Sequence, residues 1–369
     1  MKERIEEMKK KKIRVLVVDD SAFMRRAISE ILESDPQISV VARARDGLDA
    51  LQKIEQFDPD IITLDINMPV MDGLEALRRI MENRPRPVVV VSSLTQEEAP
   101  ITLQLLDLGA VDYIPKPSGT VSLDIKKISS EIVAKVKAAT GIDPKRIIRP
   151  RPRRDFAHKA EEPHPPSFAV AVGVSTGGPK TLLDIFEQVP PDSETVYLVA
   201  QHMPPQFTPS LAERLDRYTP IPFCQAQNGQ PLRGGRGYLA PGGWHMTVTD
   251  DLRIRLSKKP LNALFKPSVD VLFSSVKEVF GDRTVGILLT GIGSDGARGL
   301  LEIKQTGGVT IAESEETAVV YGMPMAAKEI GAAEVIAPCY EIPEEIHKAL
   351  LKIRRRLKNA ERRTHQRAV

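Results

Sequence analysis

The sequence predicts two α/β domains, each built on a parallel β-sheet whose two faces are covered by helices. Two observations carry this prediction. The chain has 369 residues, which is more than one ordinary hydrophobic core accommodates. Short apolar strands also alternate with amphipathic helices in both halves, and the stretch 141–167, rich in proline, arginine and lysine, interrupts this alternation. Because proline fixes φ and removes a backbone donor, that stretch is expected to form a semi-extended linker.

The first half, residues 13–140, contains five strand–helix units. Strands are expected over 13–18, 39–44, 60–64, 88–91 and 112–114, and helices over 23–32, 47–56, 74–81, 101–108 and 125–138. Strands that are buried on both faces read as continuous apolar runs, so these units predict a five-stranded parallel sheet. A charged extension, residues 1–12, precedes the first strand.

The second half, residues 168–357, returns to the same alternation. Continuous apolar strands are expected over 168–172, 195–200 and 284–289, and helices over 180–188, 268–280, 297–305 and 343–357. A glycine-rich stretch, residues 234–256, is expected to form a hairpin outside the main sheet. The pattern predicts a doubly wound α/β domain, followed by a basic C-terminal tail, residues 358–369.

The composition narrows the class of protein. Hydrophobic residues make up 41% and charged residues 27%, as in an ordinary soluble globular protein. No apolar run approaches the ~20 residues needed to span a bilayer, and residues 1–12 lack an apolar signal core, so a cytoplasmic protein without membrane insertion is expected. Cys224 and Cys339 stand far apart, as reduced thiols do. A net charge of +3, without aromatic residues among the basic runs, argues against nucleic-acid binding.

Acidic side chains end two neighbouring strands of the first half. Asp19 and Asp20 follow the first strand, and Asp65 follows the third. In a parallel sheet the carboxyl ends of such strands face one crevice, where three carboxylates repel each other unless a cation lies among them. Carboxylate oxygens with room for water suit Mg²⁺, so a magnesium site is expected here.

Two further residues point to phosphate at the same crevice. Lys116 lies just beyond the fifth strand, where its ammonium group can balance a phosphate, and Ser92 ends the fourth strand, where its hydroxyl can bind a phosphoryl oxygen. Acids at strand ends are often only solvated loop residues. Their occurrence at consecutive strand ends favours a phosphate-accepting pocket instead.

This half resembles the receiver domain of response regulators over residues 12–135. The matching motifs are Val18-Asp19-Asp20-Ser21, Asp65-Ile66-Asn67-Met68-Pro69 with Asp72-Gly73, Ser92, and Tyr113-Ile114-Pro115-Lys116-Pro117. The resemblance implies a flavodoxin-like fold that a histidine kinase phosphorylates. It implies that Asp65 is the phosphoacceptor. It also implies Mg²⁺ ligation by Asp20, Asp65 and the Asn67 carbonyl, with Asp19 acting through water, and a phosphorylation response carried by Ser92 and Tyr113.

A serine between glycines opens the second half. Gly173-Val174-Ser175-Thr176-Gly177-Gly178 follows an apolar strand and leads into an amphipathic stretch. A strand-to-helix turn of this kind exposes the serine at the sheet edge, beside helix-initial N–H groups that can receive negative charge. The pattern predicts a nucleophile. A nucleotide-binding loop is the main alternative, although the glycine spacing differs from that of a P-loop.

A base and an orienting acid follow two other strands. His202 comes two residues after the expected strand 195–200, and Asp295 lies in a glycine-rich loop after the strand 284–289. The three residues Ser175, His202 and Asp295 can therefore meet at one sheet edge as a catalytic triad. Their order along the chain differs from the Ser…Asp…His order of ordinary α/β hydrolases, which indicates a distinct topology. His245, in the expected hairpin, should line the cleft or pack beside Trp244.

Residues 167–350 resemble the catalytic domain of chemotaxis protein-glutamate methylesterases of the CheB type. The resemblance rests on Gly173-Val-Ser-Thr-Gly-Gly-Pro179, Gln201-His202-Met203-Pro204, Ala240-Pro-Gly-Gly-Trp-His245-Met246, Lys266-Pro-Ser-Val-Asp270 and Leu289-Thr-Gly-Ile-Gly-Ser-Asp-Gly-Ala297. It implies hydrolysis of γ-glutamyl methyl esters on chemoreceptor signalling helices, and deamidation of receptor glutamines, without an organic cofactor. Ile292 departs from the pattern, because relatives commonly carry methionine there, beside the oxyanion site.

Two alternatives to a phosphorylation-controlled receptor methylesterase stay open. One is a response regulator whose second half only binds a partner, although no helix-turn-helix pattern follows the linker. The other is a related esterase that acts on a protein outside chemotaxis. The sequence does not separate this last alternative from the receptor methylesterase.

Overall fold

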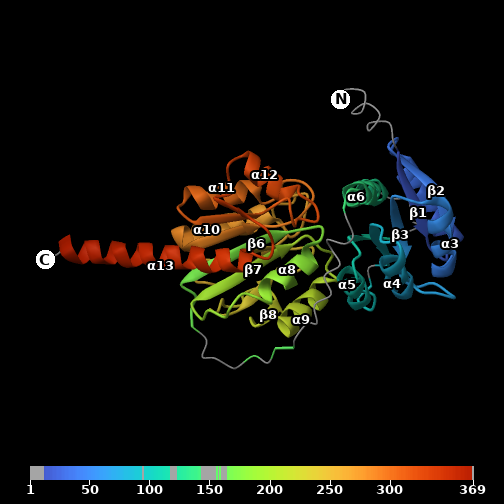
Figure 1. Cartoon of the computed structure of the whole chain (residues 1–369). Coiled ribbons are helices and arrows are strands. Elements are labelled where there is room, and N and C mark those ends of the chain that lie inside the picture. Colours follow the sequence, from blue (N-terminus) through green and yellow to red (C-terminus); the bar gives the residue numbers. More distant parts are fainter. Residues whose placement is uncertain are drawn as a thin grey trace, which may run out of the picture. The chain divides into compact units, whose positions relative to one another are not determined.

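The computed structural model describes residues 12–93, 95–116, 123–142, 155–156, 158 and 164–367. It divides into two compact units, residues 1–151 and 152–369 (Figure 1). The expected extension 1–12 lies outside the described residues except for Lys12, and so do much of the linker 141–167 and the last two residues of the tail. None of the helices in the described ranges combines the length and apolar character needed to cross a membrane.

Unit 1 is a five-stranded parallel sheet with strand order β2-β1-β3-β4-β5. Helices α2 and α6 pack together on one face, and α3, α4 and α5 follow one another on the other. The strands are β1 (Ile13–Val18), β2 (Ile38–Ala44), β3 (Ile61–Asp65), β4 (Val88–Ser92) and β5 (Asp112–Pro115), and the helices are α2 (Ala22–Glu33), α3 (Gly47–Phe57), α4 (Gly73–Asn83), α5 (Ala99–Asp107) and α6 (Leu123–Ala139). The predicted five-stranded parallel sheet is confirmed.

Local signals place the helix that follows the third strand. Asp72 caps α4 by accepting a hydrogen bond from Glu75 N at 2.8 Å. The next residue, Gly73, approaches the strand so closely that a Cβ there would lie 2.2 Å from the Asp65 carbonyl oxygen. Glycine at this position therefore lets α4 begin directly against the end of β3.

Unit 2 is a seven-stranded sheet with strand order β14-β13-β12-β6-β7-β9-β8. Every adjacent pair is parallel. The strands are β6 (Phe168–Val174), β7 (Thr195–Gln201), β8 (Phe223–Gln225), β9 (Gly237–Leu239), β12 (Thr284–Leu288), β13 (Val309–Glu313) and β14 (Val335–Ala337). The first strand of the unit, β6, lies between β7 and β12, so the direction of winding reverses between β6 and β12.

Helices cover both faces of this sheet, as expected for a doubly wound fold (Figure 1). On one face lie α10 (Val269–Phe280), α11 (Ala297–Gln305) and α12 (Met323–Glu329). On the other lie α8 (Gly178–Phe186), α9 (Thr208–Tyr218) and α13 (Ile342–Arg367). A short 3-10 helix, η1 (Gly281–Arg283), joins α10 to β12. Doubly wound sheets bind ligands at the point where the winding reverses, which is here the carboxyl end of β6 and β12.

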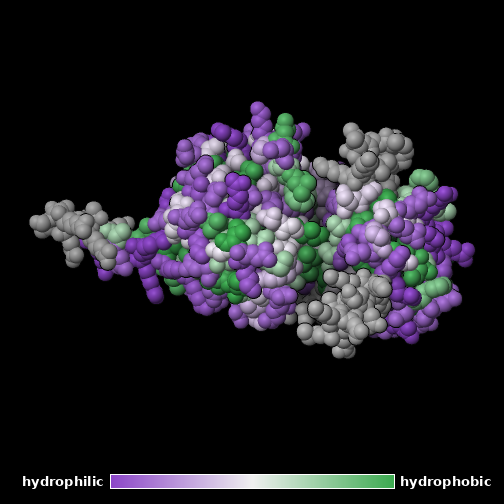
Figure 2. Space-filling view, turned by 90° about the horizontal axis from the view of Figure 1, so that it is seen from above, coloured by the Kyte–Doolittle hydropathy of each residue, from purple (hydrophilic) through white to green (hydrophobic). Residues whose placement is uncertain are grey.

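The structure corrects two predicted segments. Only part of 234–256 is a hairpin, namely β10 (His245–Val248) and β11 (Ile254–Ser257), which pair antiparallel, whereas β9 joins the main sheet beside β7. A three-residue strand is too short to show a periodicity. The helix expected over 343–357 continues to Arg367, so the described part of the tail is helical, since lysine, arginine and glutamate favour helix. Figure 2 shows hydrophilic residues where this helix leaves the unit.

Candidate catalytic and phosphoacceptor sites

The acid cluster of unit 1 forms as expected at the ends of β1 and β3. One ligand atom each from Asp19, Asp20 and Asp65 lies within 4.8 Å of the others. Asp65 is only 1% exposed, and Lys116 Nζ lies 2.7 Å from its Oδ1 and 3.6 Å from Asp19 Oδ2. Burial, together with the negative charge of Asp19, raises the pKa of Asp65 to about 6, despite the hydrogen bond from Lys116.

These carboxylates fit a divalent cation. The Oδ2 atoms of Asp19 and Asp65 are both buried and accept no hydrogen bond from the described residues. Lys116 provides one positive charge beside the two buried carboxylates. A hard cation such as Mg²⁺ would supply the missing charge and contact the free oxygens, and Asn67, two residues beyond Asp65, lies in the same loop.

Glu98, which the sequence did not single out, holds the polar groups beside the acid cluster. Its Oε2 accepts hydrogen bonds from Ser92 Oγ at 2.9 Å and Ser93 N at 2.8 Å, and its Oε1 accepts one from Asn67 Nδ2 at 2.8 Å. Burial acts to raise the pKa of Glu98, but these hydrogen bonds from Ser93 and Ser92 lower it. The Ser92 hydroxyl, which was expected to bind a phosphoryl oxygen, therefore binds a carboxylate in this structure.

Tyr113 lies on the strand next to Ser92. The two residues belong to the adjacent strands β5 and β4, and Tyr113 is 4% exposed. Lys135, on α6, places its Nζ 4.8 Å from the centre of the Tyr113 ring and donates to the Tyr113 carbonyl at 2.8 Å. Tyr113 is thus packed inside unit 1 in this structure.

The predicted triad residues of unit 2 follow three adjacent strands. Ser175 comes directly after β6, His202 comes directly after β7, and Asp295 lies in the loop after β12. The side chains of His202 and Asp295 are 5% and 13% exposed. The site therefore lies at the carboxyl ends of the central strands, where the winding reverses.

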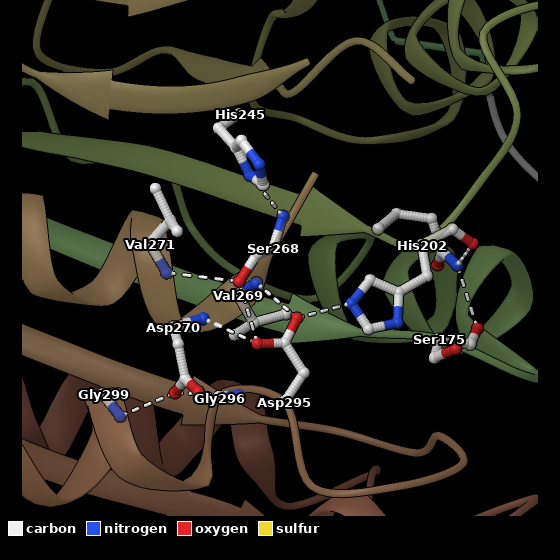
Figure 3. Close-up of polar contacts among 11 residues, drawn as sticks. Ser175, His202, His245, Ser268, Val269, Asp270, Val271, Asp295, Gly296 and Gly299 are labelled. Atoms are coloured by element: carbon white, nitrogen blue, oxygen red, sulfur yellow. Dashed lines mark hydrogen bonds and ion pairs between the residues drawn. The ribbon is translucent and has the colours of Figure 1, made fainter. Parts of the chain in front are cut away.

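The His202 ring lies between Asp295 and Ser175 (Figure 3). Its Nε2 is 2.8 Å from Asp295 Oδ2. The other ring nitrogen, Nδ1, is on the side of Ser175 and has no hydrogen-bond partner among the described residues. If Nε2 carries the proton that binds Asp295, Nδ1 is the basic nitrogen and can accept a proton from a hydroxyl. Phe265 stacks on the same ring at 4.1 Å between centroids, which restricts its tilt.

The backbone of Ser175 is held from both sides. Its N–H donates to the Thr290 carbonyl at 2.9 Å, and its carbonyl accepts from Gln201 Nε2 and from Gly178 N, each at 2.9 Å. Gly177, the N-cap of α8, has φ +79°, a left-handed conformation that favours glycine. The expected strand-to-helix turn is therefore present, and it fixes the serine at the start of a helix.

Asp295 accepts four hydrogen bonds. Its Oδ1 accepts from Ser268 Oγ at 2.9 Å and Asp270 N at 3.1 Å. Its Oδ2 accepts from Val269 N at 2.8 Å and from His202 Nε2 at 2.8 Å. Burial alone would raise the pKa of Asp295, but the His202 contact and the backbone donors lower it. The carboxylate is therefore ionised beside the histidine at neutral pH.

His245 has a different place from His202. It is fully buried on β10, its Nδ1 accepts a hydrogen bond from Ser268 N at 3.2 Å, and burial lowers its pKa. It thus supports the residue that binds Asp295 rather than the nucleophile. Trp244 beside it is 40% exposed, with Lys258 Nζ 4.9 Å from its ring centre.

Sequence reasoning missed several residues that hold this site. Glu313, fully buried at the end of β13, accepts from Thr290 N at 2.9 Å, and burial raises its pKa to about 7. Ser268 and Asp270 belong to the motif Lys266-Pro-Ser-Val-Asp270, but the sequence assigned neither residue a role. The signal that could have identified Ser268 is its position just before an apolar helical stretch, which is typical of an N-cap. For Glu313 the pattern of the sequence gives no such signal.

Comparison with known proteins agrees with both units. The family described as CheB methylesterase matches residues 170–346, and the response regulator receiver domain matches residues 15–126. A protein-glutamate methylesterase/protein-glutamine glutaminase of Pyrococcus horikoshii is 45% identical over 353 residues, which cover 93% of this chain and 95% of that protein. The chain belongs to this family.

A second relative gives the same result. A protein of the same name from Caldanaerobacter subterraneus is 48% identical over 354 residues, covering 91% of this chain and 96% of its own. The crystal structure of the Thermotoga maritima CheB methylesterase catalytic domain is 37% identical, with a TM-score of 0.47, and covers 48% of this chain and 96% of that one. Family membership confirms the predicted receiver and methylesterase halves and identifies the chain as a hydrolase.

Proposed function

We propose that the chain hydrolyses glutamate γ-methyl esters on chemoreceptors, using Ser175, His202 and Asp295, and that phosphorylation of Asp65 activates it. One observation carries the catalytic assignment. The His202 ring lies between Ser175 and Asp295, with Nε2 bonded to the acid at 2.8 Å and Nδ1 buried without a partner among the described residues. The names of the relatives supply the substrate class.

The chemistry follows from these positions. Ser175 Oγ attacks the ester carbonyl carbon while His202 Nδ1 takes its proton, and the ionised Asp295 stabilises the resulting imidazolium. The imidazolium then protonates the departing methoxide, and methanol leaves an acyl-serine. A water molecule gives its proton to His202 and attacks the acyl carbon, which releases glutamate and restores the serine. A glutamine side chain would form the same acyl-serine with loss of ammonia, which accounts for deamidation.

The receiver site supplies the control. A histidine kinase of the chemotaxis system would transfer its phosphoryl group to Asp65, and Lys116 and Ser92 would bind the phosphoryl oxygens. Asp20, Asp65 and the Asn67 carbonyl would hold Mg²⁺, with Asp19 acting through water, and the ion would supply positive charge to balance the acid cluster and the incoming phosphoryl group. Glu98 now holds the Ser92 hydroxyl at 2.9 Å, so phosphorylation is expected to release this carboxylate. Tyr113, on the neighbouring strand, is proposed to register the change with Ser92.

The decisive experiment measures methanol released from methyl-labelled chemoreceptor membranes by the full chain, with and without a small-molecule phosphodonor and Mg²⁺. We expect release that the phosphodonor increases. Ser175→Ala should remove the release, and Asp65→Asn should remove only the increase. Release from a small glutamate methyl ester but none from receptors would assign the enzyme to another protein substrate. Absence of release from both would favour a second half that only binds a partner.

A further inference from the structure

Two helix N-termini meet directly behind the candidate triad. Helix α10 begins after Ser268, and helix α11 begins after Gly296, the residue that follows Asp295. The two helices pack so closely that a Cβ on Gly296 would lie 2.4 Å from Val269 Cγ1. Each helix start leaves N–H groups without intrahelical partners, and such groups favour a negative charge.

The amides at the start of each helix bind a carboxylate from the other helix or from the loop that leads into it. Asp295, from the loop that leads into α11, accepts Val269 N at 2.8 Å and Asp270 N at 3.1 Å, which are the first two amides of α10. Asp270, on the first turn of α10, accepts Gly296 N at 3.0 Å and Gly299 N at 2.7 Å at the start of α11 (Figure 3). The two helix starts are therefore capped reciprocally, α10 by Asp295 and α11 by Asp270.

The cap of α11 depends on Asp270 for a simple reason. The N-cap residue of α11 is Gly296, which has φ +92° and no side chain with which to cap the helix. A side chain from α10 therefore takes over that part, and one atom, Asp270 Oδ1, accepts both hydrogen bonds. The backbone amide immediately after Asp295 is thereby fixed to α10.

We infer that Asp270 is a positioning residue for catalysis: its carboxylate fixes the start of α11 against α10 and so holds Asp295 at His202. Asp270 does not touch the reacting atoms. It acts through the backbone of Gly296, and Asp295 in turn holds the His202 ring. The inference rests on the proposed roles of Ser175, His202 and Asp295.

Removal of the carboxylate should loosen Asp295 rather than the substrate. In Asp270→Ala the amides of Gly296 and Gly299 lose their acceptor, and the loop that carries Asp295 is free to shift. A displacement of about 1 Å in a catalytic group can lower turnover roughly 100-fold, so we expect kcat to fall roughly 10- to 100-fold while KM stays within about twofold. The acid limb of the pH dependence of kcat/KM should also move, because Asp295 no longer keeps its place among the donors that lower its pKa.

Asp270→Asn provides the rescue. An asparagine side-chain oxygen can accept both N–H groups as Asp270 Oδ1 does, so this variant should keep kcat and the acid limb close to wild type. Asp192→Ala is the matched control. Asp192 accepts Thr195 Oγ1 at 2.8 Å and pairs with Arg354 at 2.6 Å before β7 begins, at the opposite end of the strands. It should lower the melting temperature without moving the pH profile.

The experiment measures kcat, KM and the pH profile of the full chain on a small peptide with a γ-methyl glutamate, after circular dichroism has shown each variant to be folded. Asp270→Ser, whose hydroxyl is too short to reach both amides, replaces Asp270→Ala if that variant does not fold. Wild-type kcat and acid limb in the alanine or serine variant would overturn the inference, and so would an asparagine variant as impaired as they are. Activity in Ser175→Ala, tested alongside, would instead refute the triad itself.

Discussion

Asp65 and Asp295 occupy the same kind of place in their two sheets, yet their electrostatics are opposite. Asp65 is the last residue of a buried parallel strand and Asp295 lies in the loop after another, and burial acts to raise the pKa of each. Asp65 has a second acid beside it and one buried oxygen that accepts no hydrogen bond from the described residues, and its pKa rises to about 6. Asp295 has four donors, two of them amides at a helix start, and its pKa falls. Hydrogen bonds therefore decide which site holds a stable charge.

The comparison also separates two kinds of chemistry. An acid whose charge is incompletely balanced is prepared for a cation and a phosphoryl group, which supply the missing interactions. An acid whose charge is fully satisfied changes little during a reaction and serves to orient its neighbour, which is the role proposed for Asp295 toward His202.

The largest effect is expected from a substitution that disables the hydrolytic site and leaves the acid cluster intact. Ser175→Ala should lower kcat by on the order of 10⁶, because triad members act as a unit, and adding His202→Ala should change little further. Phosphorylation of Asp65 should continue in the serine variant. Methanol release and incorporation of labelled phosphate, followed in parallel, test both statements. More than about a tenth of the wild-type activity in Ser175→Ala would overturn the nucleophile assignment.

His245→Ala is the control for the choice of base. This histidine contacts Ser268 rather than Ser175, so its replacement should reduce kcat far less than His202→Ala does. A folded, inactive His245→Ala protein beside an active His202→Ala protein would transfer the role of base to His245.

Asp295→Asn should have the next largest effect. The amide keeps the shape of the side chain but removes the charge that orients and stabilises the His202 imidazolium, so kcat should fall roughly 10²- to 10⁴-fold. The corresponding Asp65→Asn should leave basal hydrolysis unchanged and abolish the response to a phosphodonor. Steady-state kinetics of both variants measure this contrast. Equal basal losses would show that the two acids do not have separate roles.

Chelation should distinguish the sites without any substitution. The acid cluster needs a divalent cation before it accepts a phosphoryl group, whereas the proposed triad chemistry uses only protein groups and water. EDTA should therefore remove the phosphodonor response of the full chain and leave its basal ester hydrolysis as it was. Restoration of the response by added Mg²⁺ is the control, and a reversible loss of basal hydrolysis would contradict the division.

The smallest expected effect is on stability, and its sign differs between the two acids. The folded pKa of Asp65, about 6, lies above the unfolded value, so its stabilising contribution is complete below about pH 4 and is lost as the pH rises through 6. Without Mg²⁺ at pH 7, Asp65→Asn should stabilise unit 1 by about 1–2 kcal/mol. The lowered pKa of Asp295 predicts the opposite. Asp295→Asn should lower the free energy of unfolding of unit 2, and this loss should diminish as the pH falls through the folded pKa of Asp295.

Scanning calorimetry at pH 4 and pH 7, with unit 1 and unit 2 followed as separate transitions, measures both changes. A gain at pH 7 that persists undiminished at pH 4 would show that the Asp65 effect is not electrostatic. Destabilisation of unit 1 by Asp65→Asn at pH 7 would contradict the proposed difference in electrostatics between Asp65 and Asp295.

Much of the fold could be predicted from the sequence, because a continuous apolar run of five or more residues indicates a buried strand. Every strand of unit 1 lies within two residues of its predicted bounds, and β6, β7 and β12 were also found. The strands β8, β9 and β14 were missed, since three residues carry no readable period, and the five-residue strand β13 was missed as well. At the sites, residues directly after strands were predictable from the geometry of parallel sheets. Glu98 and Glu313 were not, because their contacts depend on how distant segments pack.

The order of the strands has a consequence for biosynthesis and folding. Ser175 and His202 come directly after two consecutive strands, β6 and β7. Asp295 is made 93 residues after His202, and β12, the strand before it, must pair beside β6 at the centre of the sheet. Closing such a long loop is among the slower events in forming an α/β sheet. A nascent chain that has already formed β6 and β7 thus holds a serine and a histidine without their acid. Esterase activity should therefore appear only when the central sheet is complete.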